Sequence, residues 1–236
     1  EAAGYEGMMV TADVPAAGKR DRDIRNKLAV PFRVTPEVLL QLAMTPRWTL
    51  TSLSHGKPNI ANYADLLRAA TSYADVQKTL ITPSFTWDDL KRLRDRWKGT
   101  LLVKGILHPD DALKCAKLGC DGIVVSNHGG RQVAFGPPTI EALPAIADAV
   151  GGRLKILLDS GIRRGADVLR AKALGADFTL AGRALAFGVG AGGRDGAERA
   201  MQILTLELER ALGQLGTAAF ADVGPDALSR PRAGNR

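Results

Sequence analysis

The sequence predicts an α/β fold in which strands of a parallel sheet alternate with helices. Five short runs rich in Val, Ile and Leu lack polar alternation, as expected for strands that are covered on both faces. A motif of glycine, any residue, an acidic residue and an apolar run occurs three times, at Gly4, Gly119 and Gly175. Each copy indicates a helix end, a short turn and a buried strand. The strands recur about every 20 to 30 residues, which is typical of an α/β barrel or a doubly wound sheet.

The expected elements follow one another in a regular order. Strands are expected at residues 8–13, 101–106, 122–127, 154–159 and 178–182. Helices are expected at residues 87–98, 110–118, 139–150, 164–174 and 197–213. Two further helices are expected, one that begins at Thr35 and one near residues 63–80. Thr86 and Asp89 resemble a capping box, and Thr139 is a plausible N-cap. The first two strands are far apart in sequence, so residues 15–84 are expected to form an extension or lid on the loop side of the sheet.

Composition restricts the class of protein. The 236 residues, of which 45% are hydrophobic, suffice for one large core, expected over residues 1–228, with a polar tail at 229–236. No apolar run approaches the ~18–20 residues that a membrane span needs. Cys115 and Cys120 form neither a zinc motif nor a disulfide framework, which favours a reducing, cytoplasmic location. The net charge of +7 favours anionic partners, but no nucleic-acid-binding motif is present.

Polar residues gather where the predicted strands end, and these ends meet at one edge of a parallel sheet. They are Thr11, Asp13 and Arg20, then Lys104, the run from Ser126 to Gln132, the run from Asp159 to Gly165, and finally Gly182 and Arg183. Gly161 and Gly182 would let backbone N–H groups approach phosphate oxygens, and Arg163 and Arg183 would add positive charge. Glycine and arginine are also common in tight turns between strands and helices. Two adjacent strand ends with the same chemistry nevertheless favour a phosphate site.

His128 and Lys104 are the other candidates for chemistry. His128 follows a buried strand and precedes two glycines that open space beside it, which favours a catalytic base over a structural hydrogen-bonding group. Asp13 is placed to orient its ring and to stabilise an imidazolium. Lys104, at the end of an apolar run, either faces an anion in the barrel mouth or extends along the rim to reach solvent.

Taken together, these stretches resemble the family of FMN-dependent L-2-hydroxy acid oxidases and dehydrogenases. The matching stretches are Val10 to Pro15, Gly18-Lys19-Arg20, Asp23 to Asn26, Leu102 to Gly105, Ser126 to Gln132, Asp159 to Gly165, and Gly182-Arg183. The Ser-Asn-His-Gly-Gly-Arg-Gln run is the most specific of them. The resemblance covers most of the chain and implies a (β/α)8 TIM barrel that holds FMN, of which about the last five strands are present here.

The resemblance also implies a role for each site residue. His128 matches the family's base with Asp13 as its partner, Arg131 and Arg20 match residues near the substrate carboxylate, and Lys104 matches a lysine beside the flavin N1/O2 edge. Thr11 and Ser126 would lie near the flavin, while Asp159, Ser160, Gly161, Ile162, Arg163, Gly182 and Arg183 would hold the ribityl chain and phosphate. The implied reaction is oxidation of a mandelate- or lactate-like L-2-hydroxy acid to the 2-oxo acid. Electrons would pass to oxygen or to a membrane quinone chain, and the complete protein would form a homo-oligomer.

Two departures and several alternatives accompany this interpretation. The first strands of the family have no counterpart, so the chain is expected to be N-terminally incomplete, and Val133-Ala134-Phe135 follows Gln132 where relatives often have Leu-Asp. Another phosphate-binding FMN barrel enzyme and a catalytically inert fragment are the alternative functions. The segment from Pro46 to Pro58 resembles a region that some mandelate and lactate dehydrogenases use for membrane association. An ordinary lid over the barrel mouth is the other interpretation, and peripheral contact with the inner face of the cell membrane stays open.

Overall fold

The computed structural model describes residues 3–16, 18–19, 21–26, 34–56, 83–133 and 135–229. The chain forms two compact units. The larger comprises Glu1–Gly18 and Ser84–Arg236, and the smaller comprises Lys19–Pro83. The expected helix near 63–80 and residues 230–236 of the expected tail lie outside the described residues.

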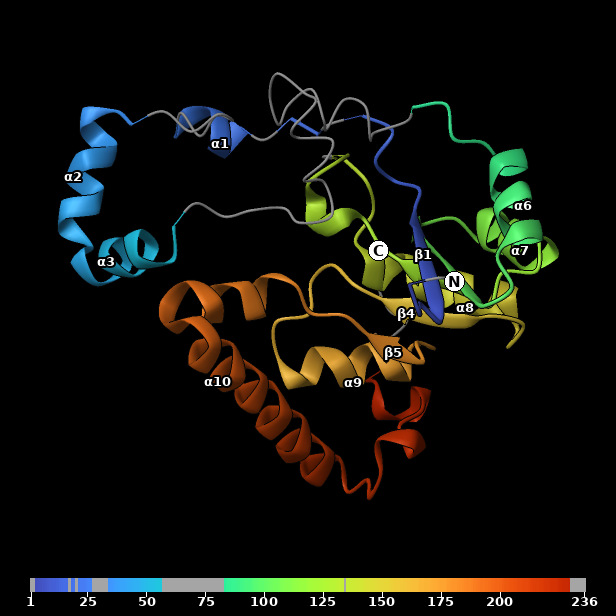
Figure 1. Ribbon diagram of the computed structural model, residues 1–236. Coiled ribbons are helices and arrows are strands. Elements are labelled where there is room, and N and C mark those ends of the chain that lie inside the picture. Colours follow the sequence, from blue (N-terminus) through green and yellow to red (C-terminus); the bar gives the residue numbers. More distant parts are fainter. Residues whose placement is uncertain are drawn as a thin grey trace. The chain divides into compact units, whose positions relative to one another are not determined.

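The larger unit is built on a five-stranded parallel sheet (Figure 1). Its strands are β1 (Gly7–Thr11), β2 (Thr100–Ile106), β3 (Gly122–Val125), β4 (Lys155–Leu158) and β5 (Phe178–Thr179). They pair in the order of the sequence, with every neighbouring pair parallel. The helices are α6 (Trp87–Arg96), α7 (Pro109–Lys117), α8 (Thr139–Val150), α9 (Gly165–Ala173) and α10 (Arg183–Leu215). Sequential parallel strands linked by helices are the arrangement of a (β/α)8 barrel, and the predicted α/β fold is confirmed.

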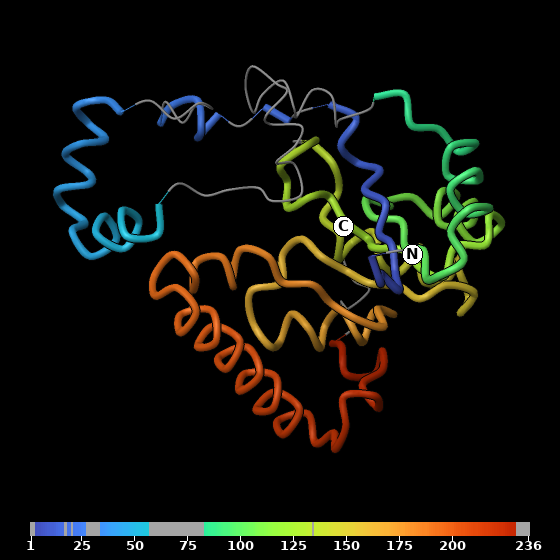
Figure 2. The backbone as a smooth tube through the Cα atoms, viewed as in Figure 1, coloured from blue at the N-terminus to red at the C-terminus, as the bar shows by residue number. Residues whose placement is uncertain are grey.

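The core lies between the sheet and the helices that follow its strands. In Figure 2 these strands and helices follow one another along the tube as its colour passes from green to orange. β3 is buried along its whole length, and Leu143 and Ile146 of α8 are fully buried in the same cluster. The prediction of strands covered on both faces therefore holds for β3. It is wrong for β1 and β5, which stand at the two ends of the strand order and expose Met9 and Phe178.

At Gly119 and Gly175 the repeated glycine motif is a helix-to-strand turn. Gly4, Gly119 and Gly175 have φ angles of +76°, +75° and +106°, a region that residues with a Cβ rarely adopt. Gly119 and Gly175 come directly after the C-terminal ends of α7 and α9, as the sequence predicts for caps.

The acidic residue of that motif joins neighbouring strands. Oδ2 of Asp121 accepts a hydrogen bond from the Leu101 N–H at 2.7 Å, and Oδ2 of Asp177 accepts one from the Ile156 N–H at 2.9 Å. Each carboxylate thus satisfies an amide at the start of the preceding strand. The period of the sequence revealed the motif, but this bond depends on the pairing of strands and appears only in three dimensions.

The helix boundaries agree with the sequence in most places. The capping box at Thr86 and Asp89 is present, with both hydrogen bonds formed. The expected helix at residues 197–213 lies within α10, after a break in helical geometry at Gly192 and Gly193, and a first helical segment that was not expected runs from Arg183 to this break. Across the break, Gly188 and Gly196 pack so closely that a Cβ on either would collide with the carbonyl oxygen of the other.

The smaller unit contains three described helices, α1 (Asp21–Arg25), α2 (Pro36–Met44) and α3 (Pro46–His55). α2 begins where the sequence predicts a helix, and the Thr35 hydroxyl caps it by accepting the Val38 N–H at 3.4 Å. α3 was not expected. Among the described residues, no helix is both long and apolar enough to cross a membrane.

Candidate active site

A cavity of about 360 Å³ lies at the carboxyl ends of the strands, within the larger unit. Its volume is typical of pockets that hold small molecules and cofactors. The predicted site residues that line it are Thr11, Lys104, His128, Arg131, Asp159, Ser160, Gly161, Ile162, Arg163, Gly182 and Arg183. Asp13 and Ser126 do not line it, but each contacts a residue that does. Arg20 lies outside the described residues.

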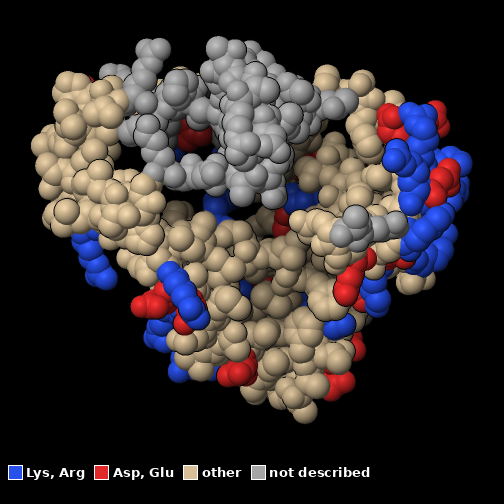
Figure 3. Space-filling model, in the orientation of Figure 1, with Lys and Arg blue, Asp and Glu red and all other residues tan. Residues whose placement is uncertain are grey.

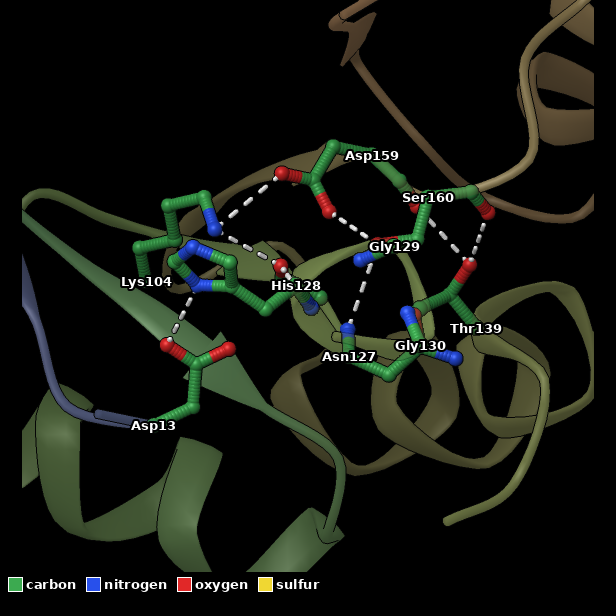
Figure 4. Close-up of polar contacts among 10 residues, drawn as sticks. Asp13, Lys104, Asn127, His128, Gly129, Gly130, Thr139, Asp159 and Ser160 are labelled. Carbon is green, nitrogen blue, oxygen red and sulfur yellow. Dashed lines mark hydrogen bonds and ion pairs between the residues drawn. The ribbon is translucent and has the colours of Figure 1, made fainter. Parts of the chain in front are cut away.

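His128 and Asp13 form a hydrogen-bonded pair beside the cavity (Figure 4). Nδ1 of the imidazole lies 3.1 Å from Oδ1 of Asp13, although 115 positions separate the residues in sequence. Because a carboxylate only accepts hydrogen bonds, Nδ1 is the nitrogen that donates, and in the neutral imidazole this leaves Nε2 as an acceptor. The other oxygen of Asp13, Oδ2, is buried and has no partner among the described residues. This pair can hold a histidine in the tautomer that a base requires.

Gly105 makes the approach of Asp13 possible. The register of β2 against β3 is irregular between Lys104 and Ile106, and Gly105 has a φ of +102° there. A Cβ at this position would lie 2.6 Å from the Asp13 Cβ and 2.7 Å from its Cγ. Glycine both adopts this backbone and leaves the space that Asp13 fills. Sequence reasoning assigned Gly105 no role, because nothing in its local pattern indicates a contact across strands.

Lys104 extends from β2 toward the loops that follow β3 and β4. Its Nζ lies 2.9 Å from Oγ of Ser126 and 3.2 Å from Oδ2 of Asp159. The side chains of Lys104 and Asp159 are only 15% and 16% exposed. The ammonium is therefore a largely buried charge with an ion-pair partner, and not a flexible group extended into solvent. It brings positive charge to the cavity, which Asp159 partly offsets.

Further positive charge stands at the opening of the cavity. Arg131, Arg163 and Arg183 line it and are exposed to solvent. Nη2 of Arg183 donates a hydrogen bond to the Gly129 carbonyl oxygen at 2.7 Å, which ties this arginine to the loop that carries His128. Gly161 has a φ of +118°, and a Cβ there would meet no atom within 4 Å. Open backbone beside guanidinium groups is an arrangement that suits phosphate.

Thr139 corrects one prediction and adds a residue to the site. It does not cap α8, because the N-cap is Pro138. Its buried hydroxyl instead lies 2.8 Å from the Asp159 carbonyl oxygen and 2.9 Å from that of Ser160. A threonine at the start of a helix reads as a cap in sequence, and only the folded chain shows that it serves the loop after β4.

A protein-family model described as FMN-dependent dehydrogenase matches residues 1–230. The chain belongs to this family. The match confirms the family that the strand-end residues predicted and, with it, FMN as the cofactor class.

Comparison with individual proteins supports the same family assignment. The chain is 42% identical over 234 residues to the L-lactate dehydrogenase of Xanthomonas axonopodis pv. citri (strain 306), covering 98% of this chain and 60% of that protein. It is 37% identical over 230 residues to the (S)-mandelate dehydrogenase of Pseudomonas putida, covering 95% and 57%. A crystal structure of the monotopic membrane protein (S)-mandelate dehydrogenase superposes with a TM-score of 0.90 at 36% identity, covering 97% and 61%. The chain thus spans about 60% of the length of the curated relatives it matches.

Proposed function

We propose that the protein oxidises an L-2-hydroxy acid of the lactate or mandelate kind to the 2-oxo acid with FMN as its cofactor. The observation that supports this most is the His128–Asp13 pair in a cavity surrounded by cationic side chains. A 2-hydroxy acid needs a cation for its carboxylate and a base for the proton of its Cα–H or hydroxyl group. Both groups occur at this cavity.

The donor set of the cavity fits FMN. Arg163 and Arg183 would hold the phosphate together with the open backbone around Gly161. Lys104 would lie beside the flavin ring. The cavity volume of about 360 Å³ and its open mouth admit a ligand of that size. When bound, FMN supplies the acceptor for the two electrons that leave the substrate.

The residues of this chain perform the remaining steps. Arg131 would bind the substrate carboxylate with parallel hydrogen bonds and turn the hydroxyl-bearing carbon toward His128. Nε2 of His128 would take up the proton, while the Asp13 carboxylate keeps the ring in place and stabilises the imidazolium that forms.

The test is flavin reduction followed under anaerobic conditions in the FMN-loaded protein. We expect His128→Ala to retain FMN and to lose reduction by L-lactate or L-mandelate by a factor of about 10² to 10⁴. The matched control is His108→Asn, because His108 caps α7 with its side chain and asparagine can replace that function. Reduction by His128→Ala at the wild-type rate would refute the proposal.

We also propose that α2 and α3 contact a membrane surface. These helices expose six large apolar side chains by more than half, namely Leu39, Leu40, Met44, Trp48, Leu50 and Leu53. In Figure 3 the surface of these two helices is mostly tan, the colour of residues other than Lys, Arg, Asp and Glu. The Thr49 hydroxyl joins the helices by donating a hydrogen bond to the Leu42 carbonyl oxygen at 2.7 Å. Exposed apolar side chains of this number favour an interface with lipid, where membrane quinones could accept the electrons.

Vesicle sedimentation tests this second proposal. The double substitution Leu50→Gln and Leu53→Gln should reduce binding to anionic lipid vesicles, because each leucine contributes about 1.5–3 kcal/mol when fully buried. Met201→Gln with Leu206→Gln, on an exposed part of α10, is the matched control. Equal binding by both double variants and the wild type would contradict it.

A further inference from the structure

Ser160 has an unusual backbone for a residue with a side chain. It follows β4 and has a φ of +68°, in the left-handed region that glycine favours. A glycine would adopt this turn without strain. The side chain at this position therefore needs a reason other than backbone geometry.

The hydroxyl of Ser160 makes as many hydrogen bonds as a hydroxyl can (Figure 4). It donates to Oδ1 of Asp159 at 2.6 Å. It accepts the N–H of Gly129 at 2.8 Å and that of Asn127 at 3.3 Å. One proton and two lone pairs are the full capacity of this group. The two accepted bonds come from the loop after β3, so a single oxygen joins two neighbouring strand ends.

His128 lies between the two residues whose amides Ser160 holds. It also has a positive φ, +56°, and its own N–H donates to Oγ of Ser126 at 3.1 Å. Three consecutive amides, from Asn127 to Gly129, thus donate to serine hydroxyls. The unfavourable backbone conformation of His128 is maintained because the three amides each have a fixed hydrogen-bond acceptor.

Thr139 fixes the turn that carries Ser160. Thr139 is 1% exposed, and its hydroxyl lies within hydrogen-bonding distance of the carbonyl oxygens of Asp159 and Ser160. Asp159 in turn is ion-paired to Lys104. The loop after β4 is therefore a rigid support for the loop after β3, and both loops line the same cavity.

We propose that Ser160 is a positioning residue that couples the two loops, so that a ligand held by the loop after β4 also fixes the backbone of His128. The hydrogen-bonded link that Ser160 makes between the two loops, called the clamp below, follows from the hydrogen bonds of the free protein. The identity of the ligand, FMN, rests on the proposed function. Binding of the cofactor and placement of the base are then linked through one hydroxyl group.

Amide hydrogen exchange in the chain without ligand tests the clamp. Ser160→Gly removes the hydroxyl and relieves the backbone, whereas Ser160→Ala removes the hydroxyl and keeps the positive φ. Both variants should accelerate exchange at Asn127 and Gly129 by about fivefold or more, as expected for the loss of one hydrogen bond. Amides of β3 and the control Ser84→Ala, at an exposed serine before α6, should not change. Wild-type exchange rates at Asn127 and Gly129 in Ser160→Gly would overturn the proposal.

The second measurement tests the coupling by adding FMN. In the wild type, FMN should slow exchange at Asn127 and Gly129. In Ser160→Gly, quenching of flavin fluorescence should still report binding, while protection at these two amides is lost. Equal protection in both proteins would overturn the coupling. If FMN does not bind to the wild type, the proposed function fails, and the comparison without ligand still decides whether Ser160 is the clamp.

Discussion

Gly105→Ala tests whether the Asp13–His128 pair requires the space that Gly105 leaves. The new Cβ would lie 2.6 Å from the Asp13 Cβ and 2.9 Å from its backbone nitrogen. Carbon atoms in contact lie about 3.5–4.0 Å apart, so Asp13 must retreat by about 1 Å or β2 must deform. The present Nδ1–Oδ1 distance of 3.1 Å has no slack for such a displacement.

Two effects of this substitution can be separated. Forcing alanine to a φ of +102° should destabilise the fold by about 1–3 kcal/mol. Displacing the partner of the base by about 1 Å should lower kcat/KM for flavin reduction by about 10²-fold. Thermal unfolding measures the first effect, and anaerobic stopped-flow reduction of the FMN-loaded enzyme measures the second.

Gly119→Ala is the matched control for Gly105→Ala. Gly119 has a φ of +75°, but a Cβ there would meet no atom within 4 Å, and it lies in the turn after α7, away from the cavity. It should show the loss of stability without the loss of rate. If both variants lose stability alike and both reduce flavin at the wild-type rate, the reasoning about Gly105 is refuted.

Two further outcomes follow from the charges in the larger unit. Burial raises the pKa of the Asp177 carboxyl, but bonds from the Ile156 N–H and the Lys155 ammonium outweigh this and hold that pKa below its ordinary value. A carboxyl whose pKa is lowered by folding stabilises the protein above its unfolded pKa of about 3.9, and this contribution is lost as the pH falls through the folded value. Asp177→Asn should therefore flatten the fall in unfolding free energy below about pH 4, and an unchanged acid-unfolding curve would contradict this. Lys104→Met should weaken FMN binding by about 10- to 100-fold in a fluorescence titration, since it removes a cavity cation and leaves Asp159 without its ion-pair partner; unaltered affinity would exclude this role.

The sequence predicted the parts of the structure that depend on local pattern. The apolar runs identified five strands, and the strand ends are brought together around one cavity because parallel strands all end at the same edge of the sheet. That rule is enough to predict that Asp13 and His128 meet across 115 positions of sequence. The roles of these residues in catalysis remain proposals.

Contacts across elements were not predictable in this way. The Gly188–Gly196 contact joins the two helical segments of α10 on either side of the break at Gly192 and Gly193, and only the folded chain shows why glycine is needed at both positions. Gly105 and Thr139 serve Asp13 and the loop after β4 through space, and their local sequences indicate only a strand and a helix start. The exposure of β5 likewise depends on its place at the end of the sheet.

A crystal structure of the protein with FMN and a 2-oxo acid would test the central claim most directly. The account predicts the carboxylate of the acid against the Arg131 guanidinium, and its 2-oxygen about 2.6–3.2 Å from Nε2 of His128. The Nδ1–Oδ1 contact with Asp13 should remain. An acid bound with its 2-oxygen away from His128, or an imidazole turned out of the cavity, would contradict the account.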